Sequence, residues 1–396
     1  MRTSTDISVT HTEDSHLLQL LRDLVAIPSV NPATLDEDPS HVGEFRMVEY
    51  LDAYFRRLGL TVERLSAEEN RPNLVAMLKR GSSSRHLLLE AHTDTVGTRG
   101  MTVDPFSGEM RDNRLYGRGA CDTKGPMAAY LTTIHRIVEH DLPFDGILSF
   151  AACMGEEDGC HGARYLMRSG FRADAAVVAE PTTLRLINAH KGAFWWRLII
   201  RGKAGHGAEP ALGVNAIYRV GRVLGMIEDN LLPALDQHHD PILGVPTVNV
   251  GTIKGGQKTN VIPDECVIEI DRRTVSGEDP DVILTDFLRR VERLGIPAGD
   301  VRVEEVQRAF PFITSREEPV VRAMADALER LGEEVSPTSV NYFSDAGEFA
   351  AAGIPSIVFG PGDIRRAHTA DEYIELDQLE RAVPVLMGTV VRFFNR

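Results

Sequence analysis

Short apolar runs that stop at an acidic or histidine residue are the feature that most restricts the fold of this chain. His92 ends one such run, Glu156 and Glu157 follow a second, Glu180 follows a third, and His368 lies beyond a fourth. Runs of this kind are typical of strands buried in a parallel sheet. Because ligands bind at the carboxyl ends of strands in open α/β sheets, the sequence predicts a metal centre at one sheet edge.

Strands and helices alternate through the first half of the chain, which is the pattern of βαβ units. Amphipathic spacing predicts the helices, and apolar runs predict the strands. The predicted helices cover 15–27, 42–58, 126–139 and 161–168, and the predicted strands cover 73–78, 85–91, 146–153 and 175–179.

The middle third has a different order, β-α-β-β-α-β, which is that of a ferredoxin-like sandwich. Its predicted strands are 193–201, 246–254, 265–273 and 301–306, and its predicted helices are 214–230 and 281–294. The α/β pattern resumes after residue 307. We therefore predict an α/β catalytic domain with a mostly parallel sheet, built from 1–187 and 307–396. An α+β lid and dimerisation domain, 188–306, is inserted into it, and its strand edge would pair two copies as a homodimer.

Composition excludes several classes of partner. The chain has 43 Lys and Arg against 58 Asp and Glu, a net charge of −15, which disfavours binding to nucleic acid and to anionic membranes. No apolar stretch reaches the roughly 20 residues of a membrane helix, and the N-terminus does not resemble a secretory signal. Four cysteines without a CxxC motif indicate a reducing, cytoplasmic setting without a disulfide framework.

The chemistry of the clustered side chains predicts two metal ions. Imidazoles and carboxylates together suit Zn²⁺, with Co²⁺ or Mn²⁺ as substitutes. Asp122, Glu157 and Glu180 carry three negative charges, which two divalent cations and one hydroxide would balance. Asp94 lies two residues after His92 and is placed to orient its ring.

At these residues the sequence resembles the M20 family of metallo-aminoacylases and exopeptidases. The resemblance spans nearly the whole chain, and its motifs occur in the family's order. It is strongest to the branch that contains acetylornithine deacetylase and succinyl-diaminopimelate desuccinylase. The motifs are His-Thr-Asp-Thr-Val at 92–96, Leu-Tyr-Gly-Arg-Gly-Ala-Cys-Asp-Thr-Lys-Gly at 115–125, Glu-Glu-Asp-Gly at 156–159, Ala-Glu-Pro-Thr at 179–182, and Gly-Pro-Gly-Asp-Ile to Ala-His-Thr-Ala-Asp-Glu at 360–372.

The resemblance implies a role for each predicted metal ligand. Asp122 would bridge the two ions, and the peptide bond that follows it would be cis. His92 and Glu180 would complete one metal site, while Glu157 and His368 would complete the other.

The resemblance also implies the catalytic and substrate-binding groups. Glu156 would be the general base, and Asp94 the partner of a ligand histidine. His206 would donate a hydrogen bond to the developing oxyanion, often across a dimer interface. Asn260 and Arg273 would hold a substrate carboxylate, and closure of the inserted domain would bring these groups over the metals.

The expected reaction is hydrolysis of the amide of a small N-acyl amino acid. A metallo-exopeptidase, either a carboxypeptidase or a dipeptidase acting on short peptides, is the alternative within enzymes. A non-catalytic metal-binding homologue is the alternative outside them. Cys153-Met154-Gly155 and Thr123 depart from residues frequent in the family, which leaves the substrate open.

Overall fold

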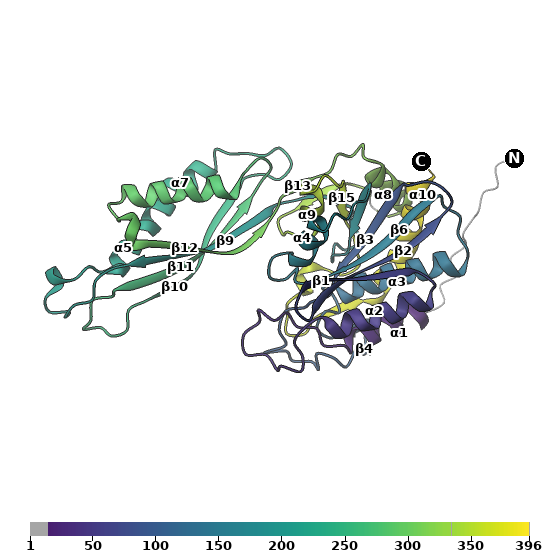
Figure 1. Ribbon diagram of the computed structural model, residues 1–396, viewed down its shortest axis with the longest axis horizontal. Helices are drawn as coiled ribbons and strands as arrows, with labels where there is room; N and C mark the ends of the chain where they lie inside the picture. The colour runs from purple at the N-terminus through teal and green to yellow at the C-terminus, as the bar shows by residue number, and fades with distance from the viewer. Residues whose placement is uncertain (1–14, 334, 396) are drawn as a thin grey trace.

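A nine-stranded sheet forms the larger body of the protein (Figure 1). The computed structural model describes residues 15–333 and 335–395. The strand order is β1-β2-β6-β3-β7-β15-β8-β13, and β14 pairs with β8. The strands are β1 Thr61–Glu68, β2 Arg71–Arg80, β3 His86–His92, β6 Gly146–Cys153, β7 Ala175–Val178, β8 Ile187–His190, β13 Phe312–Ile313, β14 Thr338–Val340 and β15 Ser356–Val358.

The sheet is mixed, so the prediction of a mostly parallel sheet is wrong. The neighbours β6, β3, β7 and β15 are parallel, but β1, β2 and β13 pair antiparallel with their neighbours, as do β15 and β8. The physical reason is clearest at β1 and β2. The turn between them is tight, with Asn70 at φ 59°, and a tight turn joins only antiparallel strands.

Helices cover both faces of this sheet. Leu87 and Leu89 of β3 belong to the core on one face, whereas Leu88 belongs to the core on the other. Burying each such side chain contributes roughly 1.5–3 kcal/mol. Helices α1 Ser15–Val25, α2 Phe45–Arg57, α3 Lys124–Glu139, α8 Pro319–Arg330 and α10 Leu376–Phe394 supply the first core, and α4 His161–Arg168 and α9 Ala346–Ala351 the second. With both faces covered, the strand ends are left for a polar site.

A four-stranded antiparallel sheet stands beside the larger body and is joined to it where β9 follows β8 (Figure 1). Its strand order is β10-β11-β9-β12. The rings of Trp196 and Phe287 pack 5.4 Å apart in the core between this sheet and its helices. The elements follow the expected β-α-β-β-α-β order: β9 Gly192–Arg201, α5 Ala216–Met226, β10 Thr247–Gly255, β11 Glu265–Thr274, α7 Pro280–Arg293 and β12 Val301–Ala309. The domain limits at 188 and 306 stay a prediction.

Shorter elements complete the fold. Among the described residues, no helix combines the length and hydropathy that a bilayer crossing requires. The shorter elements are a three-stranded sheet of β16 Tyr373–Glu375, β5 Arg114–Tyr116 and β4 Glu109–Arg111, a π-helical turn Ile227–Leu231, helix α6 Leu232–Leu235, and the 3₁₀ turns Pro210–Leu212, Ala298–Asp300 and Ile364–Arg366.

Candidate metal centre

The predicted metal ligands meet at the carboxyl ends of the central parallel strands. His92 is the last residue of β3, Glu157 lies in the turn after β6, and Glu180 follows β7. Parallel strands end at one edge of a sheet, which is why these residues converge. Asp122 precedes α3, and His368 follows a 3₁₀ turn, Ile364–Arg366. Their roles as ligands stay a prediction, but the structure brings them together.

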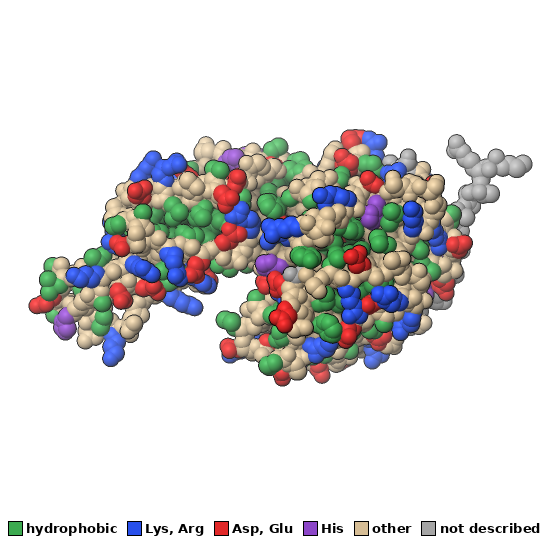
Figure 2. Space-filling model, viewed as in Figure 1, with side chains coloured by type: hydrophobic (Ala, Val, Ile, Leu, Met, Phe, Trp, Pro, Cys, Tyr) green, Lys and Arg blue, Asp and Glu red, His purple; other side chains and the backbone are tan. Residues whose placement is uncertain are grey.

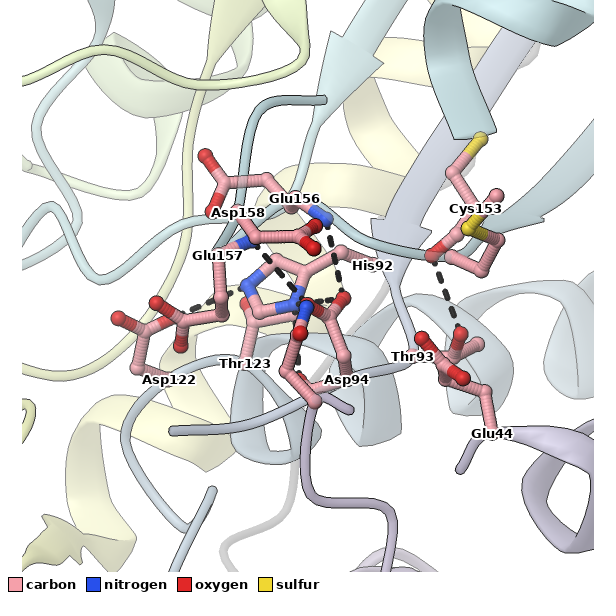
Figure 3. A network of polar contacts seen from close by, with 12 residues as sticks. Glu44, His92, Thr93, Asp94, Asp122, Thr123, Cys153, Glu156, Glu157 and Asp158 are labelled. Carbon is pink, nitrogen blue, oxygen red and sulfur yellow. Dashed lines mark hydrogen bonds and ion pairs between the residues drawn. The ribbon is translucent and has the colours of Figure 1, made fainter. Parts of the chain in front are cut away.

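Asp122 lies between two histidines, His92 and His368. Figure 3 shows it close to His92 and Glu157. Its Oδ1 is 3.0 Å from Nε2 of His92, and its Oδ2 is 3.3 Å from Nε2 of His368. Glu180 Oε1 is 3.9 Å from the His92 nitrogen, and Glu157 Oε2 is 3.2 Å from the His368 nitrogen. Asp122 therefore offers one oxygen to each of two histidine–glutamate pairs, which is the arrangement of a bridging carboxylate.

Electrostatics show that the cluster holds more negative charge than its histidines balance. Burial, followed by the charge of Asp122, raises the pKa of Glu180 well above its usual range. Burial and the charge of Glu180 do the same to the pKa of Glu156. Hydrogen bonds to Asp122 and Glu157 raise the pKa of His368 to about 11. Crowded carboxylates with imidazole neighbours are a donor set that fits divalent cations.

Asp94 orients both His92 and the turn after β6. The Nδ1 of His92 donates to the main-chain oxygen of Asp94 at 3.0 Å, so Nε2, which faces Asp122 Oδ1, is the ring nitrogen that would bind a metal. The buried Asp94 carboxylate accepts from Asn31 Nδ2 at 2.7 Å and from the N–H groups of Glu156 and Glu157, at 3.1 Å each. Burial would raise the pKa of Asp94, but hydrogen bonding and the charge of His92 outweigh it and hold that pKa below the usual value.

Glu372 holds the main chain of Cys121 and Asp122 in place. Its Oε1 accepts from the N–H groups of Cys121 and Asp122 at 3.0 and 3.1 Å, and its other oxygen pairs with Arg118. Thr123 Oγ1 donates to the carbonyl oxygen of Ala179, the residue after β7, at 2.7 Å. The expected cis peptide between Asp122 and Thr123 is present. Sequence reasoning did not identify Glu372 as a support, although it lies in one of the motifs.

The residues predicted to bind substrate from the insert lie outside this cluster. His206 and Asn260 are neighbours, since the N–H of Gly207 donates to the Asn260 oxygen at 2.9 Å. Arg273, on β11, pairs with Asp271 at 3.1 Å. Figure 2 shows a notch between the four-stranded sheet and the larger body, with acidic and histidine side chains where the two parts meet.

The structure also contains a second buried group of possible metal ligands, which was not predicted. It consists of Glu90, two residues before His92 on β3, with Cys153 and Asp345. Its possible ligand atoms lie within 4.8 Å of one another. The carboxyl oxygens of Glu90 and Asp345 are buried without a hydrogen-bond partner among the described residues. Burial and the charge of Asp345 raise the pKa of Glu90 well above its usual range, and burial raises that of Asp345 to about 6. Glu90 lies inside an apolar run, so no sequence pattern marked it as a site residue.

Comparison with known proteins places this geometry in a family. The model of peptidase family M20/M25/M40 matches residues 88–392. The acetylornithine deacetylase of Myxococcus xanthus is 34% identical over 358 residues, which cover 88% of this chain and 92% of that protein. A tripeptidase from Staphylococcus aureus has the same fold, with a TM-score of 0.79 at 24% identity over 96% of this chain and 98% of that one.

A dinuclear metal-binding peptidase of the M20 family from Bacillus subtilis also shares the fold. Its TM-score is 0.68 at 16% identity, over 96% of this chain and 98% of that one. The resemblance drawn from the motifs is thus confirmed. The chain belongs to peptidase family M20/M25/M40 and is a hydrolase that acts on amide bonds.

Proposed function

We propose that this protein is a dinuclear zinc deacylase that removes the acyl group from an N-acyl amino acid. The observation that carries the proposal is the position of Asp122, whose two oxygens face His92 and His368 separately. Glu180 and Glu157 would complete the two sites, and Co²⁺ or Mn²⁺ would substitute for Zn²⁺. The acetylornithine deacetylase of M. xanthus and the dinuclear peptidase of B. subtilis support the reaction and the metal number.

Glu156 is the general base of the proposed reaction. Two divalent cations, when bound, polarise the acyl carbonyl and make a nucleophilic water available at neutral pH. Glu156 takes a proton from this water as its oxygen bonds to the acyl carbon, and then delivers the proton to the leaving nitrogen as the C–N bond breaks. Asp94 fixes the main chain of Glu156 and the ring of His92 during both transfers.

The insert, 188–306, supplies the remaining groups as a lid and dimerisation domain. Asn260 and Arg273 bind the substrate carboxylate, and His206 donates to the oxyanion from the same chain or from a second copy. Arg273 must leave Asp271 to do so, because the two are paired in this structure. Domain closure over the notch in Figure 2 would bring these groups to the metals.

The proposed setting is the cytoplasm, where the protein would act as a homodimer on a small molecule without nucleic-acid or membrane partners. All four cysteines are buried free thiols, which agrees with a reducing compartment. The net charge of −15 supports the absence of polyanionic partners.

A substrate screen tests the proposal. Purified protein is assayed with N-acetylornithine, other N-acetyl, N-succinyl and N-formyl amino acids, and a panel of dipeptides and C-terminally blocked peptides. We expect an N-acyl amino acid to give the highest kcat/KM, with activity lost after chelation and restored by Zn²⁺ or Co²⁺. A preference for dipeptides would instead establish the exopeptidase alternative. Metal binding without hydrolysis of any substrate would establish the non-catalytic one.

A further inference from the structure

The start of β2 runs alongside the turn that carries the proposed base. β2 and β6 are antiparallel, with Leu74 opposite Ala152. Continuing this register past the end of β6 sets Asn73 beside the last strand residue and Arg71 beside Gly155. Alternate residues of a strand project to the same face, so Arg71 and Asn73 both reach toward the turn.

Asn73 holds the beginning of this turn. Its side chain is fully buried. Its Oδ1 accepts from the N–H of Met154 at 3.0 Å, and its Nδ2 donates to the oxygen of Gly162 at 2.8 Å. One amide therefore joins the entry of the turn to the first residues of α4, where the turn ends.

Arg71 packs against one side of the turn. Its Nε and Nη2 donate to the two oxygens of the fully buried Glu44 at 3.0 and 2.7 Å, and its Nη1 donates to Glu68 at 2.9 Å. Gly155 lies directly on the guanidinium, because a Cβ at that position would stand 3.0 Å from Nη2. The same nitrogen is 4.0 Å from Asp158 Oδ1, at the far end of the turn.

We infer that Arg71 and Asn73 are positioning residues for Glu156 and Glu157. Asn73 holds the main chain of the turn through its hydrogen bonds, and Arg71 packs against Gly155. On the other side, Asp94, just after β3, accepts the N–H groups of Glu156 and Glu157. Neither Arg71 nor Asn73 is needed to touch substrate. Both act by keeping the base and a metal ligand aligned, where a displacement of about 1 Å lowers the rate about 10²-fold. The inference rests on the proposed function for its catalytic part only.

The test uses Arg71→Lys, which keeps the positive charge but loses the two-pronged contact with Glu44. A double variant, Arg71→Gln with Glu44→Gln, removes both members of the buried ion pair. The fold then does not have to bury an unpaired Glu44 carboxylate, which would be destabilising. The matched control is Arg164→Lys. Arg164 also binds a buried glutamate, Glu348, through two hydrogen bonds of 2.6 and 3.2 Å, but its guanidinium donates to Glu348 and Arg308 and not to the turn.

Positioning predicts that kcat falls about 10–100-fold in both Arg71 variants while KM changes less than about twofold. The dissociation constant of the more weakly held Co²⁺, measured by calorimetry, should rise about 10–100-fold. Arg164→Lys should change neither quantity. Unchanged kcat and Co²⁺ affinity in a folded Arg71 variant, or equal losses in the control, would overturn the inference. Wild-type protein that hydrolyses no N-acyl amino acid would refute the proposed function, while Co²⁺ affinity would still test Arg71.

Discussion

Replacing Asp94 by Asn tests how the site is held together. The carboxylate accepts from Asn31, Glu156 and Glu157 at 2.7, 3.1 and 3.1 Å, and its Oδ1 is 3.5 Å from Nδ1 of His92. An asparagine side chain keeps one acceptor oxygen and presents an NH₂ group in place of the other. At least one buried N–H donor then faces another donor and loses its partner.

The magnitude follows from these contacts. A hydrogen bond to a buried charged group contributes about 1.5–3 kcal/mol, so Asp94→Asn should lower the free energy of unfolding of the metal-free protein by about that amount. Loss of the charged partner of His92 should also weaken metal binding about 10–100-fold. The pKa of Asp94 is lowered in the fold, so its contribution exists above the unfolded value of about 3.9 and disappears as pH falls through the folded value.

Urea denaturation of the chelated proteins provides the assay. Wild type and Asp94→Asn should differ most near pH 7, and the difference should shrink as the solution is acidified toward the folded pKa of Asp94. Titration with Zn²⁺ in the presence of a competing chelator measures the loss of affinity. Equal unfolding midpoints at pH 7, together with equal Zn²⁺ affinity, would refute the assignment of Asp94 as the support of His92 and the turn.

Three further changes probe other parts of the site. Glu156→Gln should retain its metal content but lose about 10²–10⁴ in kcat, and wild-type turnover would rule out Glu156 as the base. In metal-free protein, the raised pKa of His368 stabilises the fold fully below its unfolded value of about 6.5, and this stabilisation is lost as pH rises toward about 11. The difference in urea midpoint between wild type and His368→Gln should therefore be large at pH 6 and small at pH 10. A difference that stays constant between these pH values would contradict the raised pKa of His368. Arg273→Lys should raise KM about tenfold with metal content unchanged, and an unchanged KM would exclude Arg273 from substrate binding.

Sequence reasoning located the site because β3, β6 and β7 are buried on both faces. Such strands are largely apolar runs, and an acidic or histidine residue stands at or just after the end of each, as at His92 and Glu156. β1 was missed for the opposite reason. Its sequence, Thr-Val-Glu-Arg-Leu-Ser-Ala-Glu, has no apolar run, although it pairs along β2 and makes that side of the sheet antiparallel.

The supporting residues were harder to predict, because each is a single polar side chain in an ordinary segment. Asn31 bonds to Asp94 across 63 positions of the chain, and Glu372 accepts the N–H of Cys121 across 251. No local pattern encodes contacts over such distances. Glu90 was hidden differently, since its side chain is buried within β3 like the apolar residues on either side of it.

Metal stoichiometry tests the central claim most directly. Elemental analysis by mass spectrometry would count the ions in purified wild type and Asp122→Ala, with hydrolysis of N-acetylornithine and the other N-acyl amino acids measured on the same samples. Two divalent ions per wild-type chain, and loss of both metal and hydrolysis in Asp122→Ala, are the predicted results. Hydrolysis by metal-free protein, or two ions retained without Asp122, would contradict the account.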